Sequence, residues 1–275
     1  MKFKTFLAGC LGGLLSLNSC TNSPDMTDYA AYVNPFIGTG GHGHTFPGAI
    51  VPHGMISPSP DTRIDGWDAC SGYYYADSTI NGFSHTHLSG TGCCDYGDVL
   101  LMPTVGKQQY RTTDPQSQRL AYASSFSHKN EIAEPGYYSV FLDTYQVKAE
   151  ISSTKRGAIH RYTFPENTES GFIIDLDYSL QRQTNSEMEI EVISDTEICG
   201  HKKTTYWAFD QYINFYAKFS KPFSYTLVTD SITMDNGKRL PVCKALLHFN
   251  TSKDEQVLVK VGVSAVDIAG ARKNV

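Results

Sequence analysis

The feature that most constrains the fold is a series of short segments, between residues 135 and 265, in which apolar and polar side chains alternate. In the segment 256–264, every second residue from Val257 to Val263 is a valine. Such alternation is typical of antiparallel strands that bury one face and expose the other. These segments recur about every ten residues, and no window has a sustained helical period. The sequence therefore predicts an all-β fold, a large antiparallel β-sandwich of two stacked sheets.

The expected strands are residues 139–142, 147–151, 158–164, 171–176, 187–192, 204–209, 213–219, 223–228, 245–249 and 256–264. Between two of them, Asn236-Gly237 is a signal for a type I′ hairpin turn. Residues 31–106 differ, because they are rich in glycine, proline, histidine and aromatic residues. We expect that region to form long loops and edge strands on one side of the sandwich.

Composition narrows the class of protein. Hydrophobic residues make up 40% of the chain and charged residues 19%, with 17 tyrosines and 14 phenylalanines. This balance suits a β-rich extracytoplasmic protein. The net charge of −5 argues against nucleic acid as a partner, and no run of Lys and Arg is interleaved with aromatic residues.

The N-terminus has the pattern of a targeting segment. Lys2 and Lys4 form a short positive region, and the apolar stretch that follows, residues 6–17, is too short to span a bilayer. Leu17-Asn18-Ser19-Cys20 then resembles a bacterial lipobox, in which the chain is cut before the cysteine and the thiol is lipidated.

This pattern predicts a lipoprotein signal peptide over residues 1–19, lipidation at Cys20 and a polar tether over residues 20–30. An ordinary signal peptide with an incidental cysteine is the alternative. With lipidation, the protein is expected to be exported and to lie at the periplasmic or outer-membrane surface of a Gram-negative bacterium. Its lipid anchor would then be its only contact with the membrane.

The rest of the chain holds five cysteines. They are Cys70, Cys93, Cys94, Cys199 and Cys243. An odd number excludes a complete set of disulfides, and the spacings do not match a zinc framework. We expect small buried thiols, and the sequence leaves open whether one disulfide forms among them.

A glycine-rich loop carries Gly66-Trp67-Asp68, and Trp67 is one of only two tryptophans in the chain. An indole face stacks on the apolar C–H face of a sugar ring, and a neighbouring carboxylate can accept hydrogen bonds from two adjacent hydroxyls. We therefore interpret Gly66, Trp67 and Asp68 as a sugar-binding segment. The alternative is a core tryptophan under a loop.

Two other glycine-rich loops carry histidine pairs, His42 with His44 and His85 with His87. At i and i+2, His85 and His87 are expected to share one strand face. The four could hold a transition metal, but no spacing implies a third ligand, so loop-bracing histidines are favoured. For Asp95-Tyr96-Gly97-Asp98, a turn closed by the aspartate side chains is favoured over a calcium site.

Several motifs together resemble glycoside hydrolase family 92. They are Val33–Gly40, His42–Ala49, Ser59–Thr62, Gly66–Asp68, Cys70–Tyr73, Gly82–Cys93, Gly97–Pro103 and the ending from Gly262 to Ala271. The matches run in order over nearly the whole mature chain. The resemblance is therefore far more specific than any single motif would make it.

The resemblance implies a fold and an activity. Members of family 92 are two-domain enzymes, in which an N-terminal β-sandwich packs on a C-terminal (α/α)6 barrel. They are calcium-dependent, inverting exo-α-mannosidases that trim mannose from N-glycans or mannans in the cleft between the domains. On this basis residues 31–264 are the sandwich domain, residues 265–275 begin a linker, and the barrel is absent from this chain.

The resemblance also implies roles for residues. Gly66-Trp67-Asp68 is similar to the segment that lines the terminal mannose subsite. The catalytic acid and base and most calcium ligands belong to the family's barrel, so no catalytic residue is assigned here. The implied partners are α-mannoside glycans and the barrel, in cis or from an adjacent chain. The segments that carry the histidine pairs resemble loops that brace the cleft or the domain interface in the family. Those histidines are His42, His44, His85 and His87.

Three functions compete. The favoured one is the cleft-lining half of an α-mannosidase, a truncated product that is inactive alone and exposes an apolar interface. The first alternative is a stand-alone carbohydrate-binding module, which would bind mannose weakly without turnover. The second is a histidine-rich β-sandwich metalloenzyme, which would retain a tightly bound transition metal on purification.

Overall fold

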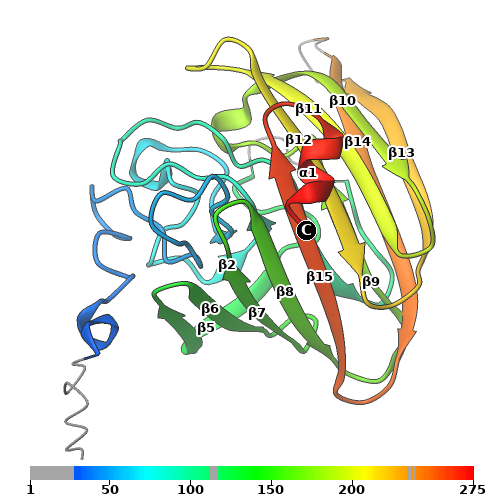
Figure 1. Ribbon diagram of the computed structural model, residues 1–275, viewed down its shortest axis with the longest axis horizontal. Coiled ribbons are helices and arrows are strands. Elements are labelled where there is room, and N and C mark those ends of the chain that lie inside the picture. The colour runs from blue at the N-terminus through cyan, green and yellow to red at the C-terminus, as the bar shows by residue number, and fades with distance from the viewer. Residues whose placement is uncertain (1–27, 112–116, 234–236, 238) are drawn as a thin grey trace, which may run out of the picture.

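The computed structural model describes residues 28–111, 117–233, 237 and 239–275, and two antiparallel sheets packed face to face make up its body (Figure 1). The predicted β-sandwich is confirmed. The expected signal peptide (1–19), the lipidation site Cys20 and Asn236 of the expected turn lie outside the described residues. Within the described ranges, no helix is long and apolar enough to cross a membrane.

Both sheets are antiparallel throughout. In spatial order, the six-stranded sheet contains β1 (Ser59–Asp61), β3 (Gly82–Ser84), β4 (Leu100–Val105), β9 (Asn167–Asp175), β14 (Arg239–Thr251) and β13 (Ser224–Thr233). The nine-stranded sheet contains β10 (Thr184–Val192), β11 (Glu197–Thr205), β12 (Gln211–Phe219), β15 (Glu255–Ser264), β8 (Gly157–Phe164), β7 (Val147–Ser153), β6 (Tyr137–Leu142), β5 (Ser124–Glu134) and β2 (Thr79–Ile80). The helical elements are η1 (Tyr29–Tyr32), η2 (Trp67–Ala69), η3 (Leu180–Arg182) and α1 (Ile268–Lys273).

The core lies between the sheets and follows the predicted alternation. On β15 the valines from Val257 to Val263 are buried, while Leu258 and Lys260 between them face solvent. The inner faces of the two sheets form one continuous hydrophobic cluster. Burying each valine in this cluster contributes about 1.5–3 kcal/mol relative to leaving it exposed.

Two expectations about strands are wrong. The predicted strand 204–209 does not form, because β11 ends at Thr205 and residues 206–210 turn back into β12. Thr204 already pairs with Gln211, so the aromatic residues between them lie in the turn despite their high strand propensity. The region 31–106 also forms more than loops and edge strands. Its strand β4 is an interior strand of the six-stranded sheet, between β3 and β9.

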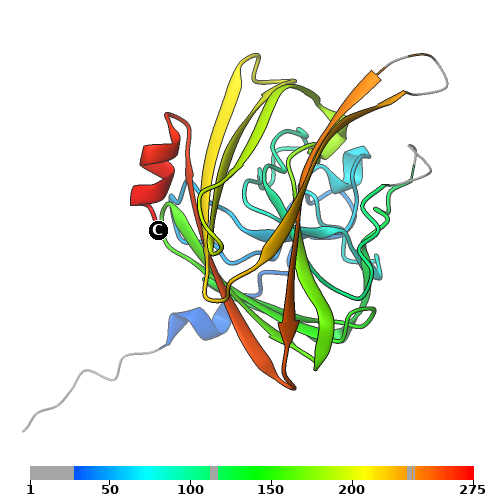
Figure 2. The same cartoon turned by 90° about the vertical axis from the view of Figure 1, so that its right-hand side faces the viewer.

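Helix α1 occupies residues expected to begin a linker. It packs on β15, β12 and β11, on the outer face of the nine-stranded sheet (Figure 2). The Asp267 carboxylate caps it by accepting a hydrogen bond of 2.6 Å from the Gly270 N–H. Ala271 is fully buried against Cys199 of β11, so this helix is part of the packed sandwich.

The glycine- and histidine-rich loops gather on one side of the two sheets, at the left of Figure 1 in blue and cyan. Backbone hydrogen bonds join them, from the Thr45 N–H to the Gly38 carbonyl at 3.2 Å and from the Gly90 N–H to the His44 carbonyl at 2.6 Å. The Ser71 hydroxyl donates to the Thr45 carbonyl at 2.9 Å. Segments far apart in sequence therefore meet here.

Candidate functional site

Trp67 opens the short helix η2 and lies at the surface. Gly66 precedes it with a φ of 109°, a conformation that residues with a side chain rarely adopt. The Trp67 side chain is 57% exposed. Trp67 is therefore not a core tryptophan under a loop.

The histidines of the first glycine-rich loop flank Trp67. The His44 and Trp67 ring centroids are 4.3 Å apart with planes at 78°, and the His42 and Trp67 centroids are 5.0 Å apart. His42 Nδ1 lies 2.5 Å from Asp68 Oδ1, and the imidazole N–H donates to the carboxylate. Both side chains of this pair are solvent-exposed. We call Gly66, Trp67, Asp68, His42 and His44 the Trp67 surface.

A third loop closes on the inner side of the Trp67 surface. A Cβ at Gly92 would lie 3.1 Å from His44 Nδ1 and 3.5 Å from Trp67 Nε1, and the Gly92 φ is positive at 61°. Glycine therefore allows this close approach. His44 is buried, and its Nε2 has no hydrogen-bond partner among the described residues.

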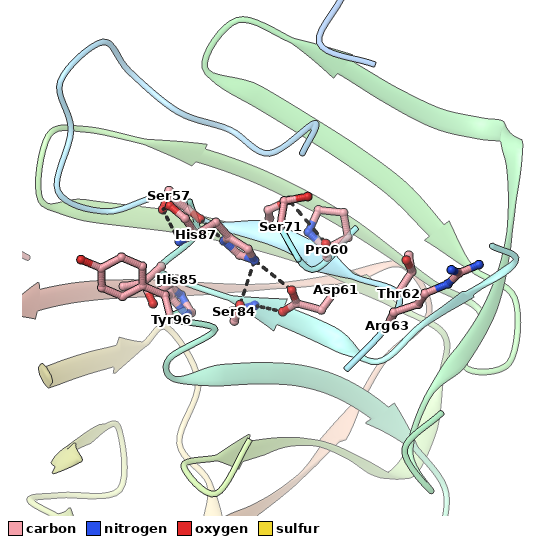
Figure 3. A network of polar contacts seen from close by, with 12 residues as sticks. Ser57, Pro60, Asp61, Thr62, Arg63, Ser71, Ser84, His85, His87 and Tyr96 are labelled. Atoms are coloured by element: carbon pink, nitrogen blue, oxygen red, sulfur yellow. Dashed lines mark hydrogen bonds and ion pairs between the residues drawn. The ribbon is translucent and has the colours of Figure 1, made fainter. Parts of the chain in front are cut away.

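His87 lies beneath the first loop instead of on the Trp67 surface. Its Nε2 is 2.9 Å from Asp61 Oδ1, and its Nδ1 donates to the Ser57 carbonyl at 2.6 Å (Figure 3). The His87 and Asp61 side chains are fully buried. Phe46, in the loop of His42 and His44, packs on the His87 ring with centroids 4.9 Å apart. His87 thus supports that loop from inside.

His85 does not share a face with His87, so that expectation is wrong. It follows the end of β3 and lies fully buried between the sheets. Its Nδ1 donates to the Val99 carbonyl at 2.6 Å, and its Nε2 is 3.1 Å from His160 Nε2. The described residues contain no group of three or more His, Cys, Asp or Glu side chains that could hold a metal ion. Among the described residues, His42, His44, His85 and His87 therefore do not gather into one such group.

The two aspartates of the Asp95–Asp98 segment contact protein groups. Asp95 Oδ2 accepts from the Ala208 N–H at 3.1 Å, and the buried Asp98 carboxylate lies 3.1 Å from Lys202 Nζ. The Gln211 amide also donates to Asp98 at 2.9 Å. The contact to Ala208 fastens the β11–β12 turn to this segment.

That turn carries exposed aromatic residues which the sequence reasoning did not select. Tyr206, Trp207 and Phe209 are 46%, 70% and 81% exposed. The sequence feature that could have indicated this surface is Trp207, the second tryptophan of the chain. It lies in a run of β-favouring residues, which led to the prediction of a strand instead of a surface.

A cleft of about 510 Å³ opens beside His87, within the usual size range of small-molecule pockets. Residues 86–89 line it, and the glycines that follow them at 90 and 92 contact the Trp67 surface. The cleft and the Trp67 surface therefore border the same loop. The apolar part of the lining includes Phe46, Ile50, Met55, Leu88 and Tyr212.

A family model described as the glycosyl hydrolase family 92 N-terminal domain matches residues 32–264. The chain belongs to this family. The resemblance carried by the sequence motifs is confirmed.

Solved structures of family 92 share the fold. The chain is 37% identical to a family 92 α-mannosidase from Bacteroides thetaiotaomicron solved with mannoimidazole, with a TM-score of 0.81, covering 89% of this chain and 33% of that one. An inverting family 92 mannosidase from the same organism is 26% identical with a TM-score of 0.72, covering 92% of this chain and 33% of that one.

A curated relative, an uncharacterized secreted glycosidase from Arthroderma benhamiae, is 32% identical over 143 residues. That match covers 51% of this chain and 18% of the relative. The chain thus spans about a third of the length of the solved mannosidases and about a fifth of the secreted glycosidase.

Proposed function

We propose that this chain is the sandwich domain of an α-mannosidase and that the Trp67 surface binds the terminal sugar of an α-mannoside. The observation that carries this is the exposed Trp67 indole beside Asp68 and His42. It occurs in a chain 37% identical to an α-mannosidase solved with mannoimidazole.

The side chains suit a neutral sugar. The indole offers an apolar face, and a sugar ring offers C–H groups to it. Asp68 Oδ1 is held by His42, and no described residue hydrogen-bonds Asp68 Oδ2, which is left to accept a sugar hydroxyl. His42 thus orients the carboxylate that would bind the sugar.

The acid and base of an inverting glycosidase stand about 6.5–9.5 Å apart on opposite sides of the sugar ring. We assign no such pair within residues 32–264. We place these carboxylates in the part of the longer relatives that this chain does not match. An (α/α)6 barrel, in cis or in an adjacent chain, is the proposed partner that completes the cleft.

Calcium is the metal that family membership suggests. The described residues do not fit it, because they contain no group of three or more His, Cys, Asp or Glu side chains placed to hold a metal ion. We therefore derive no step through calcium here, and we place its ligands with the catalytic carboxylates.

For location, we propose export with a lipid anchor at Cys20 on a Gram-negative cell. The N-terminal pattern supports this, and the relative from Arthroderma benhamiae is described as secreted. N-glycans and mannans are the proposed sources of the α-mannoside.

Replacing Trp67 with alanine should weaken binding of an α-mannoside oligosaccharide by about 1–3 kcal/mol, because the apolar stacking face is lost. Isothermal titration calorimetry on the exported chain would measure this as about a 5–150-fold rise in Kd. Trp207→Ala is the matched control, because it removes the other exposed tryptophan. Equal losses of affinity in the two variants would show that Trp67 has no special role in binding the sugar.

The chain alone should release no mannose from an aryl α-mannoside, with calcium or with a chelator. The reason is that the proposed catalytic carboxylates lie outside it. Release that depends on calcium would show that the sandwich holds a catalytic pair, and the division of roles proposed above would be wrong.

A further inference from the structure

Two adjacent residues of η3 have a backbone conformation that residues with a side chain rarely adopt. Gln181 has a φ of 57° and a ψ of 24°, and Arg182 has a φ of 48°. These angles lie in the left-handed region, which glycine enters freely and asparagine and aspartate enter at a smaller cost. Such a conformation persists only where surrounding contacts hold it, and residues of this kind cluster at functional sites. The contacts that Gln181 and Arg182 make therefore indicate what the conformation supports.

Gln181 and Arg182 hydrogen-bond to three consecutive residues in the segment that leads into η2. The Gln181 N–H donates to the Ile64 carbonyl at 2.7 Å, and the side-chain Nε2 of Gln181 donates to the Gly66 carbonyl at 3.4 Å. Arg182 Nε donates to Asp65 Oδ2 at 2.6 Å. The left-handed backbone of η3 thus directs one main-chain donor and two side-chain donors at residues 64–66.

A second segment holds Ile64 and Asp65 as well. The Gln118 Oε1 accepts from the Ile64 N–H at 2.9 Å and from the Asp65 N–H at 3.0 Å. Gln118 Nε2 donates to Asp65 Oδ1, while Arg182 binds Oδ2. Arg182 Nη2 donates to the carbonyl of Ser117, the neighbour of Gln118, at 2.9 Å. The Arg182 guanidinium therefore joins the two segments that hold Asp65.

Packing does not fix the conformation of Gly66. Its φ is 109°, and a Cβ built on it would meet no atom of the described residues within 4 Å, apart from its chain neighbours. Glycine has wide conformational freedom, so a Gly66 without restraint could turn in several directions. Because Trp67 follows directly, the direction of its side chain depends on the hydrogen bonds that hold residues 64–66.

We propose that Arg182, together with Gln181, is a positioning residue for Trp67. We call Gln118, Gln181 and Arg182 the Arg182 clamp. An arginine suits this role because its planar guanidinium donates in two directions at once, here to a carboxylate and to a carbonyl. The consequence for sugar binding rests on the proposed function, whereas the clamp on residues 64–66 stands apart from it.

The η3 end of the clamp is itself held by the loop that contacts the Trp67 indole. Leu180 is fully buried, and its N–H donates to the Tyr96 carbonyl at 3.1 Å. The Gln183 Nε2 donates to the same carbonyl at 3.3 Å. Tyr96 belongs to the loop that carries Gly92, which lies against the indole. The backbone before Trp67 and the loop beside its ring are therefore held to the same segment.

Tryptophan fluorescence tests the clamp without any sugar. The chain has two tryptophans, so Trp207→Phe leaves Trp67 as the only one. In this background, Arg182→Met keeps the apolar stem of the side chain and removes the guanidinium. The amplitude of nanosecond local motion of Trp67, measured by time-resolved fluorescence anisotropy, should rise about twofold. An unchanged anisotropy decay would overturn the proposal.

Arg161→Met in the same background is the matched control. Arg161 also pairs with a carboxylate, that of Glu150 at 2.7 Å, and its side chain is 46% exposed against 33% for Arg182. This pair joins β8 to β7, so its loss should leave the Trp67 anisotropy unchanged. An equal rise in both variants would mean a general loosening of the fold and would refute the positioning role.

Two further measurements keep the test decisive if Arg182→Met fails to fold. Arg182→Gly removes the same guanidinium, and glycine fits the left-handed backbone, so this variant should fold and still loosen Trp67. In the unsubstituted protein, the amide hydrogens of Gln181, Ile64 and Asp65 should exchange slowly with solvent, because each donates a hydrogen bond in the clamp. Fast exchange of all three would refute the clamp.

A final comparison separates the clamp from the proposed function. Arg182→Met should raise the Kd for an α-mannoside oligosaccharide several-fold, and Arg161→Met should not. If Trp67 loosens in Arg182→Met but the unsubstituted protein binds no mannoside, the clamp stands and the proposed function fails. If mannoside binds and Arg182→Met changes neither the anisotropy nor the Kd, the proposed function stands and the clamp fails.

Discussion

Replacing Lys202 with methionine should lower the free energy of unfolding by about 3–5 kcal/mol, because the change leaves a charged carboxylate buried without its cation. The Lys202 and Asp98 side chains are both fully buried, with Lys202 Nζ 3.1 Å from Asp98 Oδ1. Asp98 Oδ1 has no hydrogen-bond partner among the described residues, so its contact with Lys202 Nζ is not a hydrogen bond. Lys202 Nζ donates instead to the Tyr178 carbonyl at 2.7 Å, so its interaction with Asp98 is mainly one of charge.

The pair matters because of what Asp98 holds. Its Oδ2 accepts from the Thr86 hydroxyl at 2.8 Å, and its backbone carbonyl accepts from the His85 N–H at 2.9 Å. Lys202 belongs to β11 of the nine-stranded sheet, whereas Asp98 ends the loop that carries Gly92. The ion pair therefore fastens the loop behind the Trp67 surface to the sheet.

Urea unfolding followed by circular dichroism would measure the loss. Lys218→Met is the matched control, because Lys218 lies on the adjacent strand, is about half exposed and pairs with Glu197 at 3.0 Å. An exposed pair of this kind contributes little, so the control should unfold almost as the unsubstituted protein does. Combining Lys202→Met with Asp98→Asn should recover part of the loss. Equal midpoints for Lys202→Met and Lys218→Met would show that the buried pair is not needed.

The sandwich could be predicted because most inward-facing residues are apolar, as the valines of β15 show. Two strands that escaped prediction, β5 and β11, carry polar residues inward. On β11 the buried residues include Lys202 and Thr204, and on β5 they include Glu131. Glu131 accepts hydrogen bonds from the hydroxyls of Tyr73 at 3.0 Å and Tyr138 at 2.6 Å. Local alternation cannot reveal such partners, because they come from other segments: Tyr138 from the neighbouring strand β6 and Tyr73 from a loop 58 residues away in the sequence.

The candidate site, like the fold, could be predicted from the sequence only in part. The exposure of Trp67 followed from its glycine-rich setting, and its chemistry could be argued from neighbouring Asp68. The contact of His42 with Asp68 depends on how two loops fold against each other, so no spacing in the sequence indicates it. The i, i+2 rule failed for His85 and His87 because β3 ends at Ser84, so the rule for strand faces does not apply there.

Acid should destabilise the fold through His85 and His160. Burial lowers the pKa of His85 to about 4 and the pKa of His160 well below its ordinary value of 6.5. The unfolded chain therefore binds more protons than the folded chain between pH 6.5 and about 4, and the free energy of unfolding falls as the pH falls through that range. His85 alone accounts for about 3 kcal/mol.

The hydrogen bonds explain why both rings are neutral. His85 Nδ1–H donates to the Val99 carbonyl, so its Nε2 accepts a hydrogen bond from His160 Nε2–H at 3.1 Å. His160 Nδ1 then accepts from the Tyr162 hydroxyl at 2.9 Å. A proton added to either ring would place two N–H groups against each other or a charge in the core.

Unfolding in urea between pH 4.5 and 7.5 would test this, with the double variant His85→Leu and His160→Leu beside the unsubstituted protein. The slope of the double variant should be smaller by the contribution of the two histidines, whatever its stability at pH 7.5. The control variant His53→Gln, which changes an exposed histidine, should keep the slope of the unsubstituted protein. Asp177 acts in the opposite sense, because burial raises its pKa to about 7 and its protonation favours the folded state as the pH falls. Since all three proteins contain Asp177, its contribution cancels in the comparison, and equal slopes in the double variant and the unsubstituted protein would contradict the role of the histidine pair.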